Sequence, residues 1–244
     1  MRFHVAFAAS VPKDAAAPAL NEDAWAHDDC LSCIALSDGA SESYDSKSWA
    51  RLLVHQYAED QRFNAEWVAR AVKGYMGRVD FDSLGWAQQR AFDRGSYATL
   101  LGLTLAENDV DLDILAVGDS LAIHVRDGVV LDTYPFTRPE QFEARPKLVS
   151  TKSASNTFLG ESDFFGSCSR TWAVQPGDIV LAVTDAVGQW LLSECLNKTH
   201  GVELLLKMTS ESDFSELVER LRAEHRIKLD DSTLIRLSVL EDEK

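Results

Sequence analysis

The 244-residue chain has little positive charge and no long apolar run. Its 24 lysines and arginines stand against 39 aspartates and glutamates, which gives a formal net charge of −15. Binding to nucleic acids or anionic membrane surfaces requires clustered Lys and Arg, so this deficit argues against both partners. No apolar stretch approaches the roughly 20 residues needed to span a bilayer. With 45% hydrophobic and 26% charged residues, the composition also excludes wholesale disorder.

Cysteine is scarce, and its four positions do not form a metal site. Cys30 and Cys33 make one C-x-x-C, but we predict a strand there, in which residues three apart point to opposite faces. The sequence has no second C-x-x-C and no H-x-x-x-H pair, so a zinc site is excluded. We interpret the cysteines, including Cys168 and Cys195, as small buried residues of a reduced cytoplasmic protein.

The chain is predicted to contain runs of strands and runs of helices. Arg2 and the apolar residues after it resemble a leader only weakly, because His4 interrupts them, so we expect a first strand followed by a loop. Asp127-Gly128 lies between two apolar runs and predicts a hairpin. Within 43–94 we expect three helical pieces, broken by Gly74, Gly77 and the segment 79–85. The other segments are four strands within 96–135, a surface excursion over 135–170, a buried strand over 177–185, helices over 186–197 and 212–226, and a last strand over 232–240. This order favours an α+β layered fold.

Carboxylates recur at the ends of the predicted strands. The acidic residues in question are Glu22, Asp23, Asp38, Asp119, Asp185, Asp230 and Asp231. A single Asp after a strand usually caps a turn, but several at buried strand ends can converge on one site. Clustered carboxylates repel each other unless a cation joins them, and oxygen-only ligands suit Mg²⁺ or Mn²⁺. Two such cations are a known means of hydrolysing phosphate esters.

These motifs, in their order along the chain, resemble those of a known family. The matching segments are Asn21-Glu22-Asp23, Ser37-Asp38-Gly39, Gly95-Ser96-Tyr97-Ala98-Thr99, Val117-Gly118-Asp119-Ser120, Thr184-Asp185 and Asp230-Asp231-Ser232-Thr233. The chain is similar to the metal-dependent protein phosphatases of the protein phosphatase 2C (PPM) family, as a divergent member of the bacterial type. The resemblance implies one domain over residues 1–244, a four-layer αββα sandwich of two antiparallel β-sheets flanked by helices.

The resemblance also implies a site and a reaction. Asp23, Asp38, Gly39, Asp185 and Asp230 would surround two Mn²⁺ or Mg²⁺ ions, and Asp119 would help Asp185 to hold a third, weaker ion. Glu22 and Asp231 would lie just outside these ligands. No protein nucleophile is implied: a metal-bridging water would attack phosphorus in a serine/threonine phosphoprotein. The implied partners are that substrate and a cognate Ser/Thr kinase or its targets, with no nucleic acid and no membrane.

Pro18 departs from the family pattern, which has an Arg five residues before the motif aspartate for the substrate phosphate. Proline offers neither charge nor a backbone N–H to a phosphate. The nearby Lys13 lacks the fork of a guanidinium. Basic residues of the excursion could replace it, namely Arg138, Arg145, Lys147 and Lys152. The substrate-binding residues thus stay open, and so does the choice between an active phosphatase and a catalytically weak or inactive phosphatase-like regulatory or binding module.

A remote alternative is a GDSL-type esterase. Gly118-Asp119-Ser120-Leu121 spells that signature, with Ser120 as the nucleophile. That signature normally lies near the N-terminus between a strand and a helix, whereas here a strand is predicted to follow it. The sequence also contains no D-x-x-H and no G-x-S-x-G.

Overall fold

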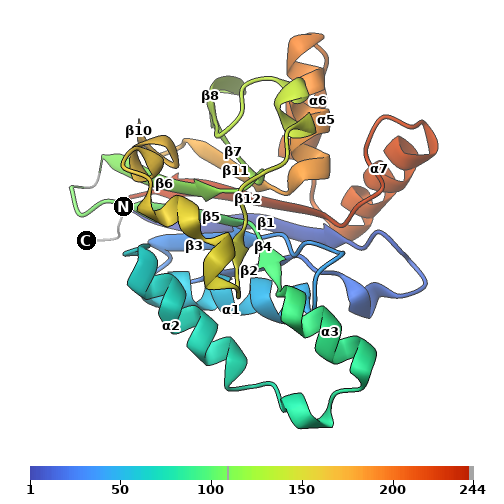
Figure 1. Cartoon of the computed structure of the whole chain (residues 1–244). Helices are drawn as coiled ribbons and strands as arrows, with labels where there is room; N and C mark the ends of the chain where they lie inside the picture. The colour runs from blue at the N-terminus through green and yellow to red at the C-terminus, as the bar shows by residue number, and fades with distance from the viewer. Residues whose placement is uncertain (109, 242–244) are drawn as a thin grey trace.

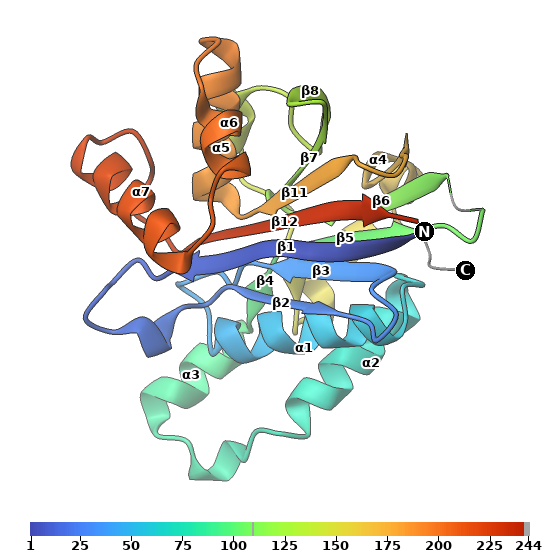
Figure 2. The same ribbon diagram turned by 180° about the vertical axis from the view of Figure 1, so that it is seen from behind.

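Two antiparallel sheets of five strands form the centre of the molecule (Figure 1, Figure 2). The computed structural model describes residues 1–108 and 110–241. The first sheet, in spatial order, contains β1 (Arg2–Val11), β12 (Ser232–Leu240), β11 (Ile179–Val183), β7 (Leu121–Arg126) and β8 (Val129–Tyr134). The second contains β10 (Ser169–Ala173), β6 (Asp111–Val117), β5 (Leu100–Leu105), β3 (Cys33–Ser37) and β2 (Ala24–His27). A short ladder joins β4 (Tyr97–Ala98) to β9 (Val149–Ser150).

The two sheets pack face to face, and helices cover their outer faces. Phe3 and Leu237 from the first sheet share an apolar core with Ile34 and Leu101 from the second. Figures 1 and 2 show one group of helices beneath the second sheet and another above the first. The first group is α1 (Ser46–Glu59), α2 (Ala65–Met76) and α3 (Trp86–Arg94), and the second is α5 (Asp185–Leu196), α6 (Gly201–Leu206) and α7 (Glu211–Ala223). This arrangement confirms the four-layer αββα sandwich.

Helix α1 shows how the local sequence forms a helix that packs on the second sheet. Its Trp49, Leu53 and Tyr57 recur at helical spacing and are all buried against the second sheet. The side chain of Tyr57 lies directly over Gly102 of β5, where a Cβ atom would come within 2.2 Å of the ring. Gly102 therefore allows the helix to approach the sheet closely.

Most of the predicted elements are present. The hairpin at Asp127-Gly128 joins β7 to β8, and both residues have the positive φ angles that such turns require, 52° and 76°. The first and last strands, β1 and β12, pair along their whole length. The helical region 43–94 consists of three α-helices and a short 3₁₀ segment, Phe81–Ser83. The expected break at Gly74 was wrong, because Gly74 lies inside α2, but α2 does end just before Gly77 and segment 79–85 separates it from α3, as expected. The break between α1 and α2, at residues 60–64, was not predicted.

Other local predictions need correction. Cys30 is exposed in a turn and strand β3 begins only at Cys33, so the interpretation of all four cysteines as buried was wrong. Asp28 explains the turn, because its carboxylate accepts backbone N–H groups of Ser32 and Cys33, each at 2.8 Å. Strand β10 and helix α6 were not predicted; both are short, and propensity is weakest for short elements.

The excursion at 135–170 carries several short elements of its own. They are the 3₁₀ segments Pro139–Glu143, Ser153–Ser155 and Thr157–Gly160, strand β9 and helix α4 (Phe164–Ser167). Phe158 and Phe164 are buried and anchor the excursion to the second sheet's core. The described part of the chain contains no helix with the length and hydrophobicity to cross a membrane.

Candidate metal centre

Carboxylates from distant parts of the sequence meet where strands of both sheets end. Asp38 follows β3, Asp119 lies between β6 and β7, Asp185 follows β11, and Asp230 precedes β12. All four line one cavity of about 220 Å³, together with Gly39 and Lys228. The sequence-based expectation that these strand ends converge is therefore confirmed in space.

Asp38 has a buried carboxyl in the lining of this cavity. Its backbone is fixed by Thr99, which accepts from Asp38 N through Oγ1 at 2.8 Å and donates its own N–H to Asp38 O at 2.9 Å. Burial raises the pKa of Asp38 well above its usual value, and the charges of Asp23 and Asp185 raise it further. A carboxylate held at such a position gains from any cation placed beside it.

Gly39 brings this aspartate close to the N-terminal acidic motif. A Cβ atom at Gly39 would lie 2.9 Å from the carbonyl carbon of Ser46 and 3.0 Å from the carbonyl oxygen of Glu22. Only glycine lets the chain after β3 pass between these two backbones.

Asp23, also a predicted ligand, is not among the residues that line the cavity, and only one of its two carboxylate oxygens has hydrogen-bond partners. Its Oδ2 accepts hydrogen bonds from Thr233 Oγ1 at 2.6 Å and Thr184 Oγ1 at 3.2 Å. Its Oδ1 is buried without a hydrogen-bond partner. Burial raises the pKa of Asp23 to about 8, with further contributions from the charges of Asp231 and Asp185. An orphaned buried oxygen of this kind needs an explanation, and a nearby cation supplies one.

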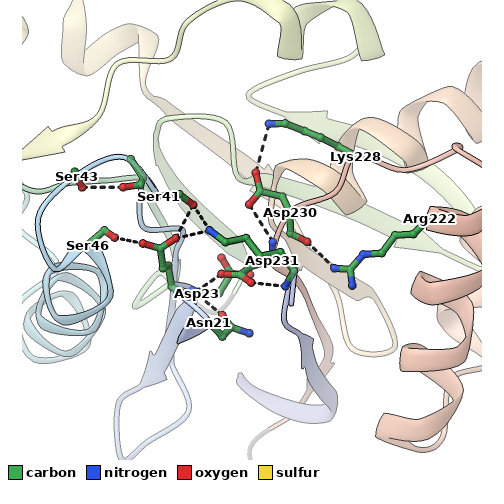
Figure 3. Close-up of polar contacts among 12 residues, drawn as sticks. Asn21, Asp23, Ser41, Ser43, Ser46, Arg222, Lys228, Asp230 and Asp231 are labelled. Carbon is green, nitrogen blue, oxygen red and sulfur yellow. Dashed lines mark hydrogen bonds and ion pairs between the residues drawn. The ribbon is translucent and has the colours of Figure 1, made fainter. Parts of the chain in front are cut away.

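Glu22 and Asp231 hold the surrounding loops in place (Figure 3). The carboxylate of Asp231 accepts the backbone N–H groups of Lys13 at 2.7 Å and Glu22 at 2.8 Å. Glu22 in turn receives Lys13 Nζ at 2.8 Å and the hydroxyl groups of Ser41 and Ser46. Burial opposes ionisation of Glu22, but these hydrogen bonds outweigh it and lower its pKa. Both residues therefore position the motifs around Asp23.

Lys228 is a member of the site that sequence reasoning missed. Its Nζ lies 2.7 Å from Asp185 Oδ2 and 3.6 Å from Asp230 Oδ2. Burial lowers its pKa, but the hydrogen bond and the charges of Asp185 and Asp230 outweigh that effect and raise it overall. Lys228 lies two residues before Asp230 in the sequence, but its contact with Asp185 spans 43 positions, and no local pattern indicates it.

Arg222 on α7 fixes the loop that carries Asp230 (Figure 3). Its Nη2 donates to the carbonyl oxygen of Asp230 at 2.6 Å, and its Nη1 donates to that of Pro12 at 2.9 Å. The guanidinium thus ties the loop after β1 to the loop before β12. This role too was not predicted.

A larger cavity of about 540 Å³ adjoins the carboxylates. It shares Ala40, Ser41, Leu148 and Asp230 with the first cavity. Two arginines line it: Arg94 at the end of α3 and Arg145 from the excursion. Of the four basic excursion residues singled out in the sequence, Arg145 is the one in this lining. Lys147 is paired with Glu161 at 2.5 Å, and Lys152 lies over the ring of Phe92.

Ser120 does not have the surroundings of an esterase nucleophile. It is buried, and its hydroxyl lies 2.9 Å from Thr99 Oγ1. Strand β7 follows it at once, in place of a helix. Among the described residues, no histidine forms a hydrogen bond with Ser120. Ser120 instead supports Thr99, the residue that fixes the backbone of Asp38.

The donor set of the cavity fits a hard divalent cation. The candidate ligands are carboxylate oxygens and the carbonyl of Gly39, which match Mg²⁺ or Mn²⁺ and not zinc. Burial raises the pKa values of Asp23, Asp38, Asp119 and Asp230, and the charges of neighbouring aspartates raise them further, so a cation bound beside them would be favoured. In the part of the chain that the structure describes, no three Asp, Glu, His or Cys side chains are positioned so that they could hold a metal ion together.

Comparison with solved structures identifies the fold. The chain is similar to the Mycobacterium tuberculosis serine/threonine phosphatase PstP/Ppp, with a TM-score of 0.62 and 16% identity over 98% of this chain and 99% of that one. A structure of the PstP catalytic domain with two manganese ions gives a TM-score of 0.61 at 16% identity, over 98% of both chains. The photosystem II phosphatase PBCP gives 0.61 at 14% identity, over 97% of this chain and 98% of that one.

No protein-family model and no curated protein sequence matches the chain. At identities of 14–16%, the likeness is one of fold. The chain therefore has the fold of protein phosphatase 2C-type serine/threonine phosphatases, as the motif order predicted.

Proposed function

We propose that this chain is a Mn²⁺- or Mg²⁺-dependent serine/threonine phosphoprotein phosphatase that works as one domain. The observation that supports this proposal is the convergence of aspartates from separate strand ends on one cavity, with too little positive charge around them. Without a cation such a cluster does not contribute to stability, because its carboxylates are buried and repel each other.

In this proposal the residues of the chain divide into ligands and supports. Asp23, Asp38, Asp185, Asp230 and the carbonyl of Gly39 would hold two cations, and Asp119 with Asp185 a third. Divalent cations bound there supply activation of the attacking water and neutralisation of charge on the phosphoryl group. Glu22 and Asp231 would act as supports, since their carboxylates are already bonded to neighbouring loops.

Arg145 is the residue we assign to the substrate phosphate. Pro18, which stands where the family has an arginine, is exposed in the short 3₁₀ segment Pro18–Leu20. The lysines nearest the carboxylates, Lys13 and Lys228, are engaged by Glu22 and Asp185. Arg145 lines the adjoining cavity next to Asp230, and its guanidinium can bind a phosphate bidentately.

The first test is activity of the purified protein on an aryl phosphate and a phosphopeptide. We expect hydrolysis with Mn²⁺, loss with chelator, and loss of at least about a hundredfold in Asp38→Asn, because one of the proposed metal ligands is removed. Asp113→Asn, an exposed change on β6 outside the cavity, is the matched control and should retain full activity. Absence of activity with Mn²⁺, or equal activity in Asp38→Asn, contradicts the proposal.

Arg145 has its own test. We expect Arg145→Ala to raise KM for a phosphopeptide about tenfold, because a charge-assisted pair of hydrogen bonds is lost. Lys147→Ala, two residues away but paired with Glu161, should leave KM unchanged. An unchanged KM in Arg145→Ala would remove this assignment.

The second candidate function is a phosphatase-like module with little turnover. Two observations favour it: the exposed Pro18 in place of a phosphate-binding arginine, and the lysine lodged among the carboxylates. Metal binding without hydrolysis in the same assays would select this candidate. Activity that survives chelator but disappears in Ser120→Ala would instead restore the esterase.

Partners and location follow from the same proposal. A phosphatase of this kind would act on phosphoproteins and oppose a Ser/Thr kinase or regulate its targets. The four cysteines are all unpaired, which supports the proposed location in the reducing cytoplasm.

A further inference from the structure

Lys228 places a positive charge inside the carboxylate cavity. Its Nζ contacts Asp185 Oδ2 at 2.7 Å and Asp230 Oδ2 at 3.6 Å, and its side chain is part of the cavity lining beside Asp38 and Asp119. Figure 3 shows the side chain reaching toward Asp230 from the loop before β12. The ammonium thus bridges two carboxylates at the same end of the first sheet, one just after β11 and one just before its antiparallel neighbour β12.

A divalent cation shared by Asp185 and Asp230 would draw on the same Oδ2 atoms, because the Oδ1 atoms accept the backbone N–H groups of Ala186 and Asp231. We propose that Lys228 occupies this cation position in the metal-free protein and must be displaced before a metal binds there. The inference rests on the metal-binding part of the proposed function and is independent of turnover. Lys228 thereby stabilises the metal-free protein and lowers the affinity of the site for metal.

The local structure allows this displacement. The Lys228 side chain is 55% exposed, so the ammonium can move into water without disturbing the core. The backbone of the loop is held separately, because Arg222 donates to the carbonyl oxygen of Asp230. The side chain can therefore leave while Asp230 stays in place.

The lysine contacts two of the four carboxylates that line the cavity. Its Nζ reaches Asp185 and Asp230, while Asp38 and Asp119 line the same cavity. A lysine makes only single-point contacts and cannot neutralise all the carboxylates, which agrees with the raised pKa of Asp119 and Asp38.

The test is a Mn²⁺ titration of chelator-treated protein by calorimetry. We expect Lys228→Met to bind Mn²⁺ about threefold to tenfold more tightly than the wild type, the range given by loss of one or two partly exposed ion pairs. The same variant should melt at a lower temperature without metal and gain more from added Mn²⁺. Lys228→Arg, which keeps the charge and the reach, should stay close to the wild type.

Lys13→Met separates displacement from a general change in charge. Lys13 also lies near the carboxylates, but its Nζ contacts Glu22 and Ser41. If Lys13→Met tightens Mn²⁺ binding as much as Lys228→Met does, long-range charge explains the result and the proposal is overturned. Equal or weaker binding by folded Lys228→Met overturns it as well.

A measurement on the unaltered protein guards against misfolded variants. Acetic anhydride labelling of Lys228, followed by mass spectrometry, should increase when Mn²⁺ is added, because the amine is released. Unchanged labelling at saturating Mn²⁺ overturns the proposal. Metal binding by the wild type without phosphatase activity would remove the proposed enzyme function and leave this inference standing. If neither the wild type nor Lys228→Met binds metal, the proposed function and this inference are both overturned.

Discussion

Strand β11 has a buried aspartate next to each of its ends, and the two have opposite environments. Asp178, before the strand, is fully buried and receives Arg126 Nε and Nη2 at 2.7 and 2.8 Å. It also accepts the backbone N–H of Gln175 and lies 2.8 Å from His124 Nε2. Asp185, after the strand, faces a cavity lined by Asp38, Asp119 and Asp230, with Lys228 as its ion-pair partner.

The pKa values show the consequence of this difference. Burial alone would raise the pKa of Asp178, but the hydrogen bonds from Arg126 and His124 outweigh it and lower the pKa to about 2. At the other end, burial and mutual repulsion raise the pKa of Asp23 to about 8 and that of Asp119 to about 6. A carboxylate with all its partners contributes to stability, whereas a group of carboxylates short of partners marks a place for an external cation.

The largest expected effect is the difference in stability between a variant that lacks Asp178 and one that lacks an aspartate of the cavity at the other end of β11. Asp178→Ala should lower the free energy of unfolding by about 3 kcal/mol, because it leaves a buried polar network without its centre. Asp38→Asn in the metal-free protein should leave the stability unchanged or increase it, because it relieves repulsion. Urea unfolding of both variants measures this difference. A comparable loss of unfolding free energy in both would contradict the contrast between the two ends of β11.

Metal addition should have the next largest effect, and only at one end. Mn²⁺ at about a hundred times its Kd should stabilise the folded protein by about 2.7 kcal/mol. Asp185→Asn should reduce this gain, and Asp178→Asn should leave it intact although it lowers the starting stability. A melting curve that does not respond to millimolar Mn²⁺ in the wild type would count against a cation site at this end of the strand.

The smallest effect is the dependence of stability on pH, which should have opposite signs at the two ends. Asp178 has a lowered pKa when folded, so its stabilisation is complete above about pH 4 and is lost as the pH falls toward 2. Asp23 has a raised pKa when folded, so its contribution to the stability of the folded state is complete below about pH 4 and is lost as the pH rises toward 8.

The metal-free protein should therefore melt a few degrees lower at pH 8 than at pH 6, and saturating Mn²⁺ should remove that slope. Asp178→Asn should reduce the dependence of the melting temperature on pH only below about pH 4. Melting curves between pH 3 and pH 8, with and without Mn²⁺, provide the measurement. A metal-free protein that is more stable at pH 8 than at pH 6 contradicts the assignment.

Much of the fold could be predicted from the sequence because its signals are local. Alternating and continuous apolar runs predicted the strands, and Asp127-Gly128 predicted the hairpin between β7 and β8. Acidic residues placed directly at the ends of those runs predicted that Asp38, Asp119 and Asp185 would meet. Their role as metal ligands remains a prediction.

Contacts between distant residues could not be predicted in the same way. Nothing near Asp178 indicates that it pairs with Arg126, which is 52 positions away, and Lys228 reaches Asp185 over 43 positions. Cys30 and Cys33 read alike in sequence, but an Asp28 turn leaves one exposed and buries the other.

The sequence by itself determined the layered α+β architecture and the positions of the carboxylates, because apolar periodicity and strand-end residues are properties of short segments. Only the tertiary structure decided which carboxylates are satisfied, where a lysine stands among them, and that Arg145 borders the adjoining cavity. These properties depend on distances between side chains brought together by packing, and burial then sets the strength of each charge.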